Sequence, residues 1–145
     1  MIKGLTNAGA MPALDTLMRF SARRQELIAH NVANINTPKF QPRDVSVADF
    51  QRSLGKAIDE RRTRTGGAQG KLHFGRSDEV VRDADGRLHL RPKTPSGNIL
   101  FHDRNDRDLE RLMQAQAENA GVFRAAADLY RHQGEMIRSA IREMA

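Results

Sequence analysis

The chain has 145 residues, of which 39% are hydrophobic, 5% aromatic and 29% charged. This apolar content is low for a compact globular enzyme and favours an elongated helical protein that buries stripes of side chains. The absence of cysteine excludes disulfides, thiolate metal sites and cysteine nucleophiles.

The net charge of +6 arises from 24 basic and 18 acidic residues, which are interleaved over most of the chain. A basic balance can indicate a nucleic-acid or anionic membrane partner. The densest basic cluster, Arg61, Arg62 and Arg64, has no aromatic side chains beside it, and we interpret it as a solvated linker. We therefore expect no nucleic-acid partner.

The first predicted element is a helix over residues 13–35. Pro12 suits its first turn, where a backbone N–H is not needed. Alternating spacings of four and three residues give a heptad pattern, in which Ser21 and Gln25 interrupt the apolar character. Its members are Leu14, Met18, Ser21, Gln25, Ile28, Val32 and Ile35.

The helix ends in a polar and then rigid stretch, NVANINTPKFQPRD, at residues 31–44. Asn34 or Asn36 can adopt the left-handed conformation that often ends a helix. Pro38 and Pro42 cannot continue helical hydrogen bonding, and each restricts the residue before it to an extended conformation. We therefore predict a stiff, extended connector over residues 36–43.

A shorter helix is predicted from Ser46 to just before Gly66, with Ser46 and Asp49 resembling a capping box. The following glycine-rich stretch, residues 63–98, is the least helical part of the chain. Within it, VVRDADGRLHL at 80–90 predicts a β-hairpin, with the Asp85–Gly86 pair at its turn. An isolated hairpin is marginal in water, so we expect partial mobility in this segment.

The strongest helical pattern begins at residue 105 and continues to the C-terminus. About 40 residues of helix make a rod near 60 Å long, which cannot bury its apolar stripe alone. The N-terminal helix is shorter, so part of the stripe stays exposed in a monomer and marks a partner site. Small residues in the stripe favour packing between several helices. The stripe comprises Leu109, Met113, Gln116, Ala120, Phe123, Ala127, Tyr130, Gly134, Ile137, Ile141 and Met144.

These patterns predict a mainly α fold, elongated, in which long N- and C-terminal helices pack as an antiparallel coiled-coil-like pair. A shorter helix and an irregular or β-hairpin middle segment complete it. The expected parts are an N-terminal helical part (1–62), a flexible or extended middle segment (63–104) and a C-terminal long helix (105–145).

Recognisable catalytic and cofactor patterns are absent from the sequence. The five histidines have no helical metal spacing, GGAQGK at 66–71 lacks the full phosphate-loop pattern, and no G-x-S-x-G context occurs. We expect no catalytic, metal or cofactor site and no enzymatic activity. No apolar run approaches the roughly 20 residues that cross a bilayer, and we expect no cleaved signal peptide.

The stretch LIAHNVANINTPKF, residues 27–40, resembles the N-terminal signature of the flagellar rod and hook family of bacterial axial proteins. Residues 24–54 and 95–144, in that order, resemble the proximal rod members most. Lys39 departs from the family pattern, which usually has glycine there, and would be strained if that position has a positive φ. The matching and assembly residues are Asn31, Ala33, Asn34, Thr37, Pro38, Phe40 and Pro42.

The resemblance implies a structural subunit of the proximal rod in the flagellar basal body, located in the periplasm. It implies helical assembly with copies of itself, with other rod proteins and with the MS-ring/rod adaptor, and export through the flagellar type III apparatus. Such a rod transmits torque and surrounds the export channel. In this interpretation the two prolines set a fixed bend between neighbouring subunits.

Two alternatives remain open from the residues. One is another proximal rod protein of the same family, since the middle segment discriminates only weakly between them. The other is a cytoplasmic helical binding module, either a secretion chaperone or a nucleic-acid binder. A chaperone would usually be acidic, unlike this chain, and a nucleic-acid binder would show a steep salt dependence.

Overall fold

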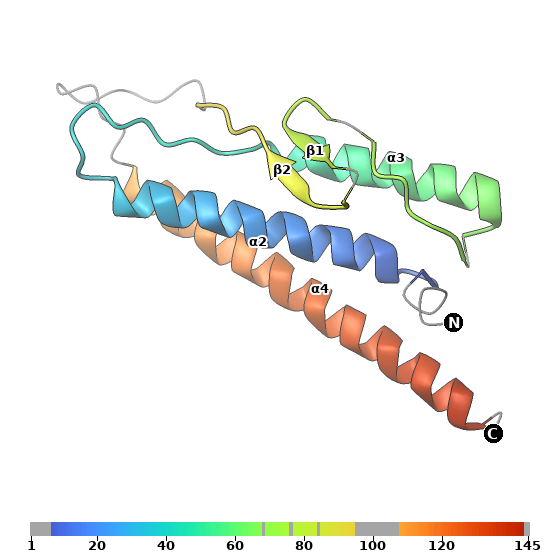
Figure 1. Cartoon of the computed structure of the whole chain (residues 1–145). Coiled ribbons are helices and arrows are strands. Elements are labelled where there is room, and N and C mark those ends of the chain that lie inside the picture. Colours follow the sequence, from blue (N-terminus) through green and yellow to red (C-terminus); the bar gives the residue numbers. More distant parts are fainter. Residues whose placement is uncertain (1–6, 68, 76, 84, 95–107, 144–145) are drawn as a thin grey trace.

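The computed structural model describes residues 7–67, 69–75, 77–83, 85–94 and 108–143. Within these ranges the chain forms three helices and a small antiparallel hairpin (Figure 1). The elements in order are α2 (Met11–Ala33), α3 (Val47–Thr65), β1 (Val80–Arg82), β2 (Leu88–Leu90) and α4 (Leu109–Glu143). The expected mainly α fold with an antiparallel pair of terminal helices is confirmed.

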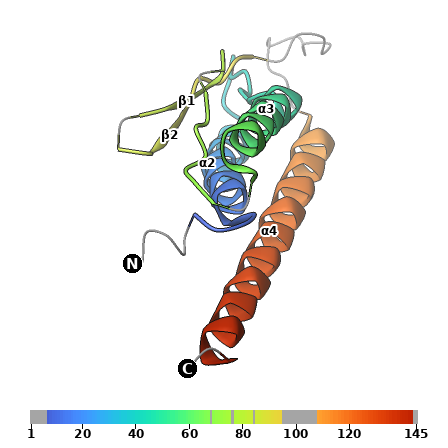
Figure 2. The same ribbon diagram turned by 90° about the vertical axis from the view of Figure 1, so that its right-hand side faces the viewer.

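Helix α2 forms the middle of the molecule. Helix α4 runs antiparallel along one side of it, while α3 and the hairpin cover the other side (Figures 1 and 2). With 23 and 35 residues, α2 and α4 are about 35 Å and 52 Å long. The C-terminal part of α4 therefore projects beyond the start of α2 (Figure 1).

The two ends of α2 each lie two residues earlier than predicted. Pro12 lies in the first turn, as expected. At the other end, the main-chain N–H and the side-chain amide of Asn34 both donate to the His30 carbonyl oxygen, at 3.2 Å and 2.9 Å. Asn34 has φ −104°, so the predicted left-handed asparagine is wrong. Among the described non-glycine residues, Lys39 is the one with positive φ.

The hydrophobic core joins α2 to α3 and the hairpin through aromatic side chains. The Phe20 and Phe50 rings stack with centroids 3.8 Å apart and planes 4° from parallel. Phe74 lies 5.5 Å from Phe50, centroid to centroid. Aliphatic residues from every covering segment complete the cluster: Val45, Leu54, Ala57, Leu72, Val80 and Leu88.

The hairpin has the predicted strands, with Val80 opposite Leu90 and Arg82 opposite Leu88. Gly86 in its turn has φ 79°, a conformation that suits glycine. The strands are not isolated, because Val80 and Leu88 are buried in the core cluster. Packing against helices supplies the stability that a free hairpin lacks.

Helix α3 begins as predicted, with the Ser46 hydroxyl accepting a hydrogen bond from the Asp49 N–H at 3.1 Å. The Ser46 N–H donates to the carboxylate of Glu79 and not to that of Asp49. The capping box is therefore only half formed. The helix ends at Gly66 in the left-handed conformation.

The predicted linker around Arg61 is wrong, because this residue lies within α3 and is buried. Its guanidinium donates to the carbonyl oxygens of Gly9 and Asn7, at 2.6 Å each. Arg62 and Arg64 are exposed. Of the three arginines, Arg61 therefore holds the segment before α2 in place.

Replacing Phe50 with alanine should lower the free energy of unfolding by about 3–5 kcal/mol, because it empties the centre of the core. Urea unfolding followed by circular dichroism measures this change. Phe123→Ala is the matched control, since Phe123 is 40% exposed on α4 and should have a much smaller effect. Equal losses in the two variants would contradict the aromatic core described here.

Candidate assembly site

The connector after α2 is fastened to that helix by one asparagine. The Asn31 side-chain amide donates to the Arg43 carbonyl oxygen at 2.7 Å, and its oxygen accepts from the Arg43 N–H at 3.1 Å. Asn31 thus pairs with both main-chain groups of a residue twelve positions later, as a neighbouring strand would. The side chain is buried, so this exchange closes the connector into a defined loop.

An ion pair about two turns earlier on α2 reinforces this closure. The Arg24 guanidinium binds the Asp44 carboxylate through two contacts, Nε to Oδ1 at 3.0 Å and an NH2 nitrogen to Oδ2 at 2.6 Å. Arg24 is mostly buried, and a two-pronged pair of this kind fixes orientation as well as distance. The main chain of Asp44 also exchanges hydrogen bonds with Lys93, at 3.0 Å each way.

We predicted an extended connector, but the connector starts with two tight turns. The Thr37 N–H donates to the Asn34 carbonyl oxygen at 2.9 Å, and the Phe40 N–H donates to the Thr37 carbonyl oxygen at 3.1 Å. The second turn has Pro38 in its second position and Lys39, with φ 61°, in its third. This is the pattern of a type II turn, whose third position favours glycine.

The predicted motif residues divide between the interior and the surface. Asn31 and Pro42 are buried, while Asn34 and Phe40 are half-buried. The Phe40 ring meets His30 edge-on, with ring centroids 5.7 Å apart. The exposed members are Ala33, Thr37 and Pro38. The first group shapes the loop, and the exposed group is accessible to another molecule.

On α4, the line of contact with α2 lies beside the predicted stripe. The buried residues of α4 are Leu112, Asn119 and Ala126, which repeat every seven positions. The stripe residues are less covered: Ala120, Ala127, Tyr130, Gly134 and Ile137 are half-buried, Leu109, Met113, Gln116, Phe123 and Ile141 are exposed, and Met144 lies outside the described residues.

Exposed apolar side chains border this contact line on both sides; Val122, Phe123 and Leu129, for example, are three or four residues from a buried one. We name them the Leu129 flank (Val122, Leu129 and Met136) and the Phe123 flank (Leu109, Met113, Phe123 and Ile141). Their side chains are 40–57% exposed. The apolar face of α4 is therefore wider than α2 can cover.

Three residues that shape this region were not singled out from the sequence: Arg24, Asp44 and Asn119. Arg24 looks like an ordinary charged helix position, and Arg61 was interpreted as part of a solvated linker, because the partners of both are known only once the chain is folded. Asn119 had a usable signal, because it lies one position from the predicted stripe and faces a heptad that Ser21 and Gln25 make polar.

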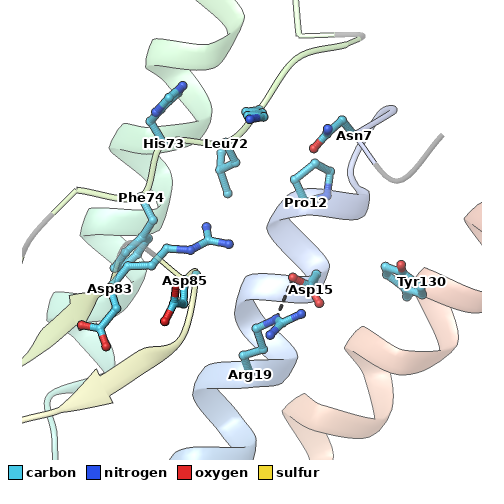
Figure 3. A pocket seen from close by; sticks show the side chains of 13 residues that line it. Asn7, Pro12, Asp15, Arg19, Leu72, His73, Phe74, Asp83, Asp85 and Tyr130 are labelled. Atoms are coloured by element: carbon cyan, nitrogen blue, oxygen red, sulfur yellow. Dashed lines mark hydrogen bonds and ion pairs between the residues drawn. The ribbon is translucent and has the colours of Figure 1, made fainter. Parts of the chain in front are cut away.

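An open cavity of about 700 Å³ lies between the start of α2, the 71–74 segment, the hairpin turn and α4 (Figure 3). Its lining mixes basic and acidic side chains, among them Arg19, Asp15 and Asp83. The Asp15 carboxylate raises the pKa of Arg19 through a hydrogen bond of 2.8 Å and through its charge.

Within the described residues, no group of three acidic, histidine or cysteine side chains could hold a metal ion. The helices of that same part of the chain include none with the length and apolar character needed to cross a membrane.

Replacing Asn31 with alanine should lower the free energy of unfolding by about 1–3 kcal/mol, because two main-chain groups of Arg43 lose their partner in a partly buried place. Asn36→Ala is the control, since Asn36 is exposed in the same loop and should change stability by less than about 0.5 kcal/mol. Denaturant unfolding measures the free energy of unfolding of both variants. Equal losses would show that the hydrogen bonds between Asn31 and Arg43 contribute nothing to stability.

Replacing Lys39 with glycine should raise the free energy of unfolding by up to about 1 kcal/mol, because relief of the left-handed conformation exceeds the entropy that glycine adds to the unfolded chain. Lys39→Val should lower it by more than about 1 kcal/mol. The matched control is Gln41→Gly, where φ is not positive and glycine should destabilise. A loss in Lys39→Gly as large as that in Gln41→Gly would contradict the strain at Lys39.

No family model matches the chain, but curated relatives do. The chain is 36% identical over 103 residues to the flagellar basal body rod protein FlgB of Salmonella typhimurium, which covers 63% of this chain and 72% of the relative. It is 34% identical over 101 residues to FlgB of Yersinia enterocolitica, with 66% and 72% covered. A shorter match, 45% over 47 residues, joins it to FlgB of Proteus mirabilis. The chain therefore belongs to the FlgB family of flagellar basal body rod proteins.

Proposed function

We propose that this protein is a non-catalytic structural subunit of the proximal rod, which assembles helically with copies of itself and with other rod proteins. The observation that carries the proposal is the apolar face of α4, which is both wider and longer than α2 can cover. Contiguous exposed apolar surface on a monomer marks a site for other protein.

The connector supplies the second element of the proposal. Asn31 and Arg24 hold residues 43 and 44 against α2, so the turn with Thr37 and Pro38 is displayed in one orientation. A subunit of a helical polymer needs such a fixed projection, because each copy must meet its neighbours at the same angle. Replacing Pro38 with alanine should then impair rod assembly more than helix content, and normal motility in that variant would count against this role.

In the assembled rod, the subunit would help to transmit torque and would form part of the wall of the export channel. Its further partners would be the MS-ring/rod adaptor and, during secretion, the flagellar type III export apparatus. Its place would be the periplasmic rod, reached without a cleaved signal peptide. These details rest on the family and on the exposed surfaces of α4 and the connector.

The test is a quantitative immunoblot of salt-washed hook–basal bodies and of cytosol from cells that produce the native chain or one of two variants. Leu129→Glu puts a charge on the Leu129 flank, and Gln114→Glu puts the same charge on an exposed position of α4 that is neither three nor four residues from a member of either flank. We expect the native chain and Gln114→Glu in the basal bodies and Leu129→Glu in the cytosol, with motility lost only in the last.

Two results would overturn the proposal. Absence of the native chain from basal bodies, together with a soluble cytosolic pool, would favour a cytoplasmic helical binding module such as a secretion chaperone. Full retention of Leu129→Glu in the basal bodies would show that the Leu129 flank of α4 makes no contact needed for assembly. Retention at a different level of the rod would instead indicate the position of a sister rod protein.

A further inference from the structure

The contact between α2 and α4 has a polar layer at its middle, formed by Ser21, Gln25 and Asn119. The Asn119 side-chain amide donates to the Ser21 carbonyl oxygen at 2.9 Å and to Gln25 Oε1 at 3.1 Å. Asn119 is 4% exposed and Ser21 is 1% exposed. A buried amide is tolerated at such a place only where its donors find acceptors.

The other residues along this line of contact discriminate poorly between alternative alignments of the two helices. Leu112 and Ala126 lie one heptad to either side of Asn119, and Ala115 is half-buried nearby. The two alanines are small and fit against many positions of a facing helix. Shape and apolar area alone therefore give little reason for one register over the next.

Asn119 does discriminate, because it has suitable acceptors at one register only. A slide of one heptad would set it against Leu14 and Met18, or in the other direction against Ile28 and Val32. These side chains offer no amide or hydroxyl acceptor, and each is bulkier than Ser21, whose small side chain leaves its own carbonyl oxygen accessible to Asn119. An amide buried among them would lose its hydrogen bonds.

We infer that the polar layer of Ser21, Gln25 and Asn119 is a register key, which specifies the antiparallel alignment of α2 and α4 at a cost in stability. A single buried asparagine is known to fix register in coiled coils in this way. The register matters for the molecule because it sets how far α4 projects beyond α2 and where its two flanks lie relative to the connector. The inference concerns the monomer and does not depend on the proposed function.

The layer leaves one atom unused, which fits a role in specificity rather than in stability. The Ser21 hydroxyl oxygen has no hydrogen-bond partner among the described residues, although it is buried. A layer built for stability would satisfy or remove this group. Here the small residue is needed for access to its own carbonyl oxygen, and its hydroxyl is left over.

The absence of cysteine allows a direct measurement of register in the full chain. Ala29 on α2 and Ala125 on α4 are exposed alanines that can be replaced by cysteine and spin-labelled. Pulsed dipolar spectroscopy, with excess unlabelled chain to suppress contacts between copies, then gives the distance between them. A slide of one heptad moves the labels about 10 Å along the helix axis.

We expect one narrow distance with the native layer. With Asn119→Leu we expect a second, displaced distance in at least about a tenth of the molecules, together with unchanged or increased resistance to urea. Gln114→Leu is the control, because Gln114 is exposed on the side of α4 away from α2, and it should retain the single distance. The double variant Gln25→Leu/Asn119→Leu makes the facing positions apolar together and should show the same displaced population.

A single distance of native width in Asn119→Leu, or in the double variant if the single one does not fold, would overturn the inference. Loss of folding in both would also overturn it, because the layer would then be required for stability rather than for register. A displaced population in Gln114→Leu would show that any added leucine shifts the helices.

Discussion

The exchange of hydrogen bonds between the Asn31 side chain and the main chain of Arg43 is the constraint on which the rest of the structure depends. It returns the chain to α2 after the two turns of the connector. The Arg24–Asp44 ion pair then fixes the next residue, and Val45 enters the core directly after it. This return defines where α3 starts and helps to bring Phe50 onto Phe20.

The two faces of α2 differ in character. The face toward α3 and the hairpin is aromatic and aliphatic, with the Phe20 and Phe50 rings stacked, and the cluster that it joins contains most of the buried apolar side chains. The face toward α4 has the polar residues Ser21 and Gln25 at its middle, where they meet Asn119 of α4. One face therefore holds the fold together, while the other aligns a long helix whose flanks remain available.

The same division applies to the family motif. Asn31 and Pro42 point inward and define the loop, whereas Thr37 and Pro38 are displayed on it. A motif of this type serves two purposes with few residues, because the inward group makes the orientation of the outward group reproducible. Lys39 shows how strongly the loop is specified, since it accepts a left-handed conformation that its side chain disfavours.

The sequence by itself determined the helices, the hairpin, the antiparallel pairing and the family, because periodicity, turn residues and a contiguous motif are local signals. Only the tertiary structure decided that Arg24 and Arg61 are buried and that Asn119, rather than the neighbouring stripe, faces α2. A heptad pattern fixes which residues share a face, but a wide apolar face leaves the line of contact open. The line of contact depends on α2, which provides hydrogen-bond acceptors for Asn119 at Ser21 and Gln25.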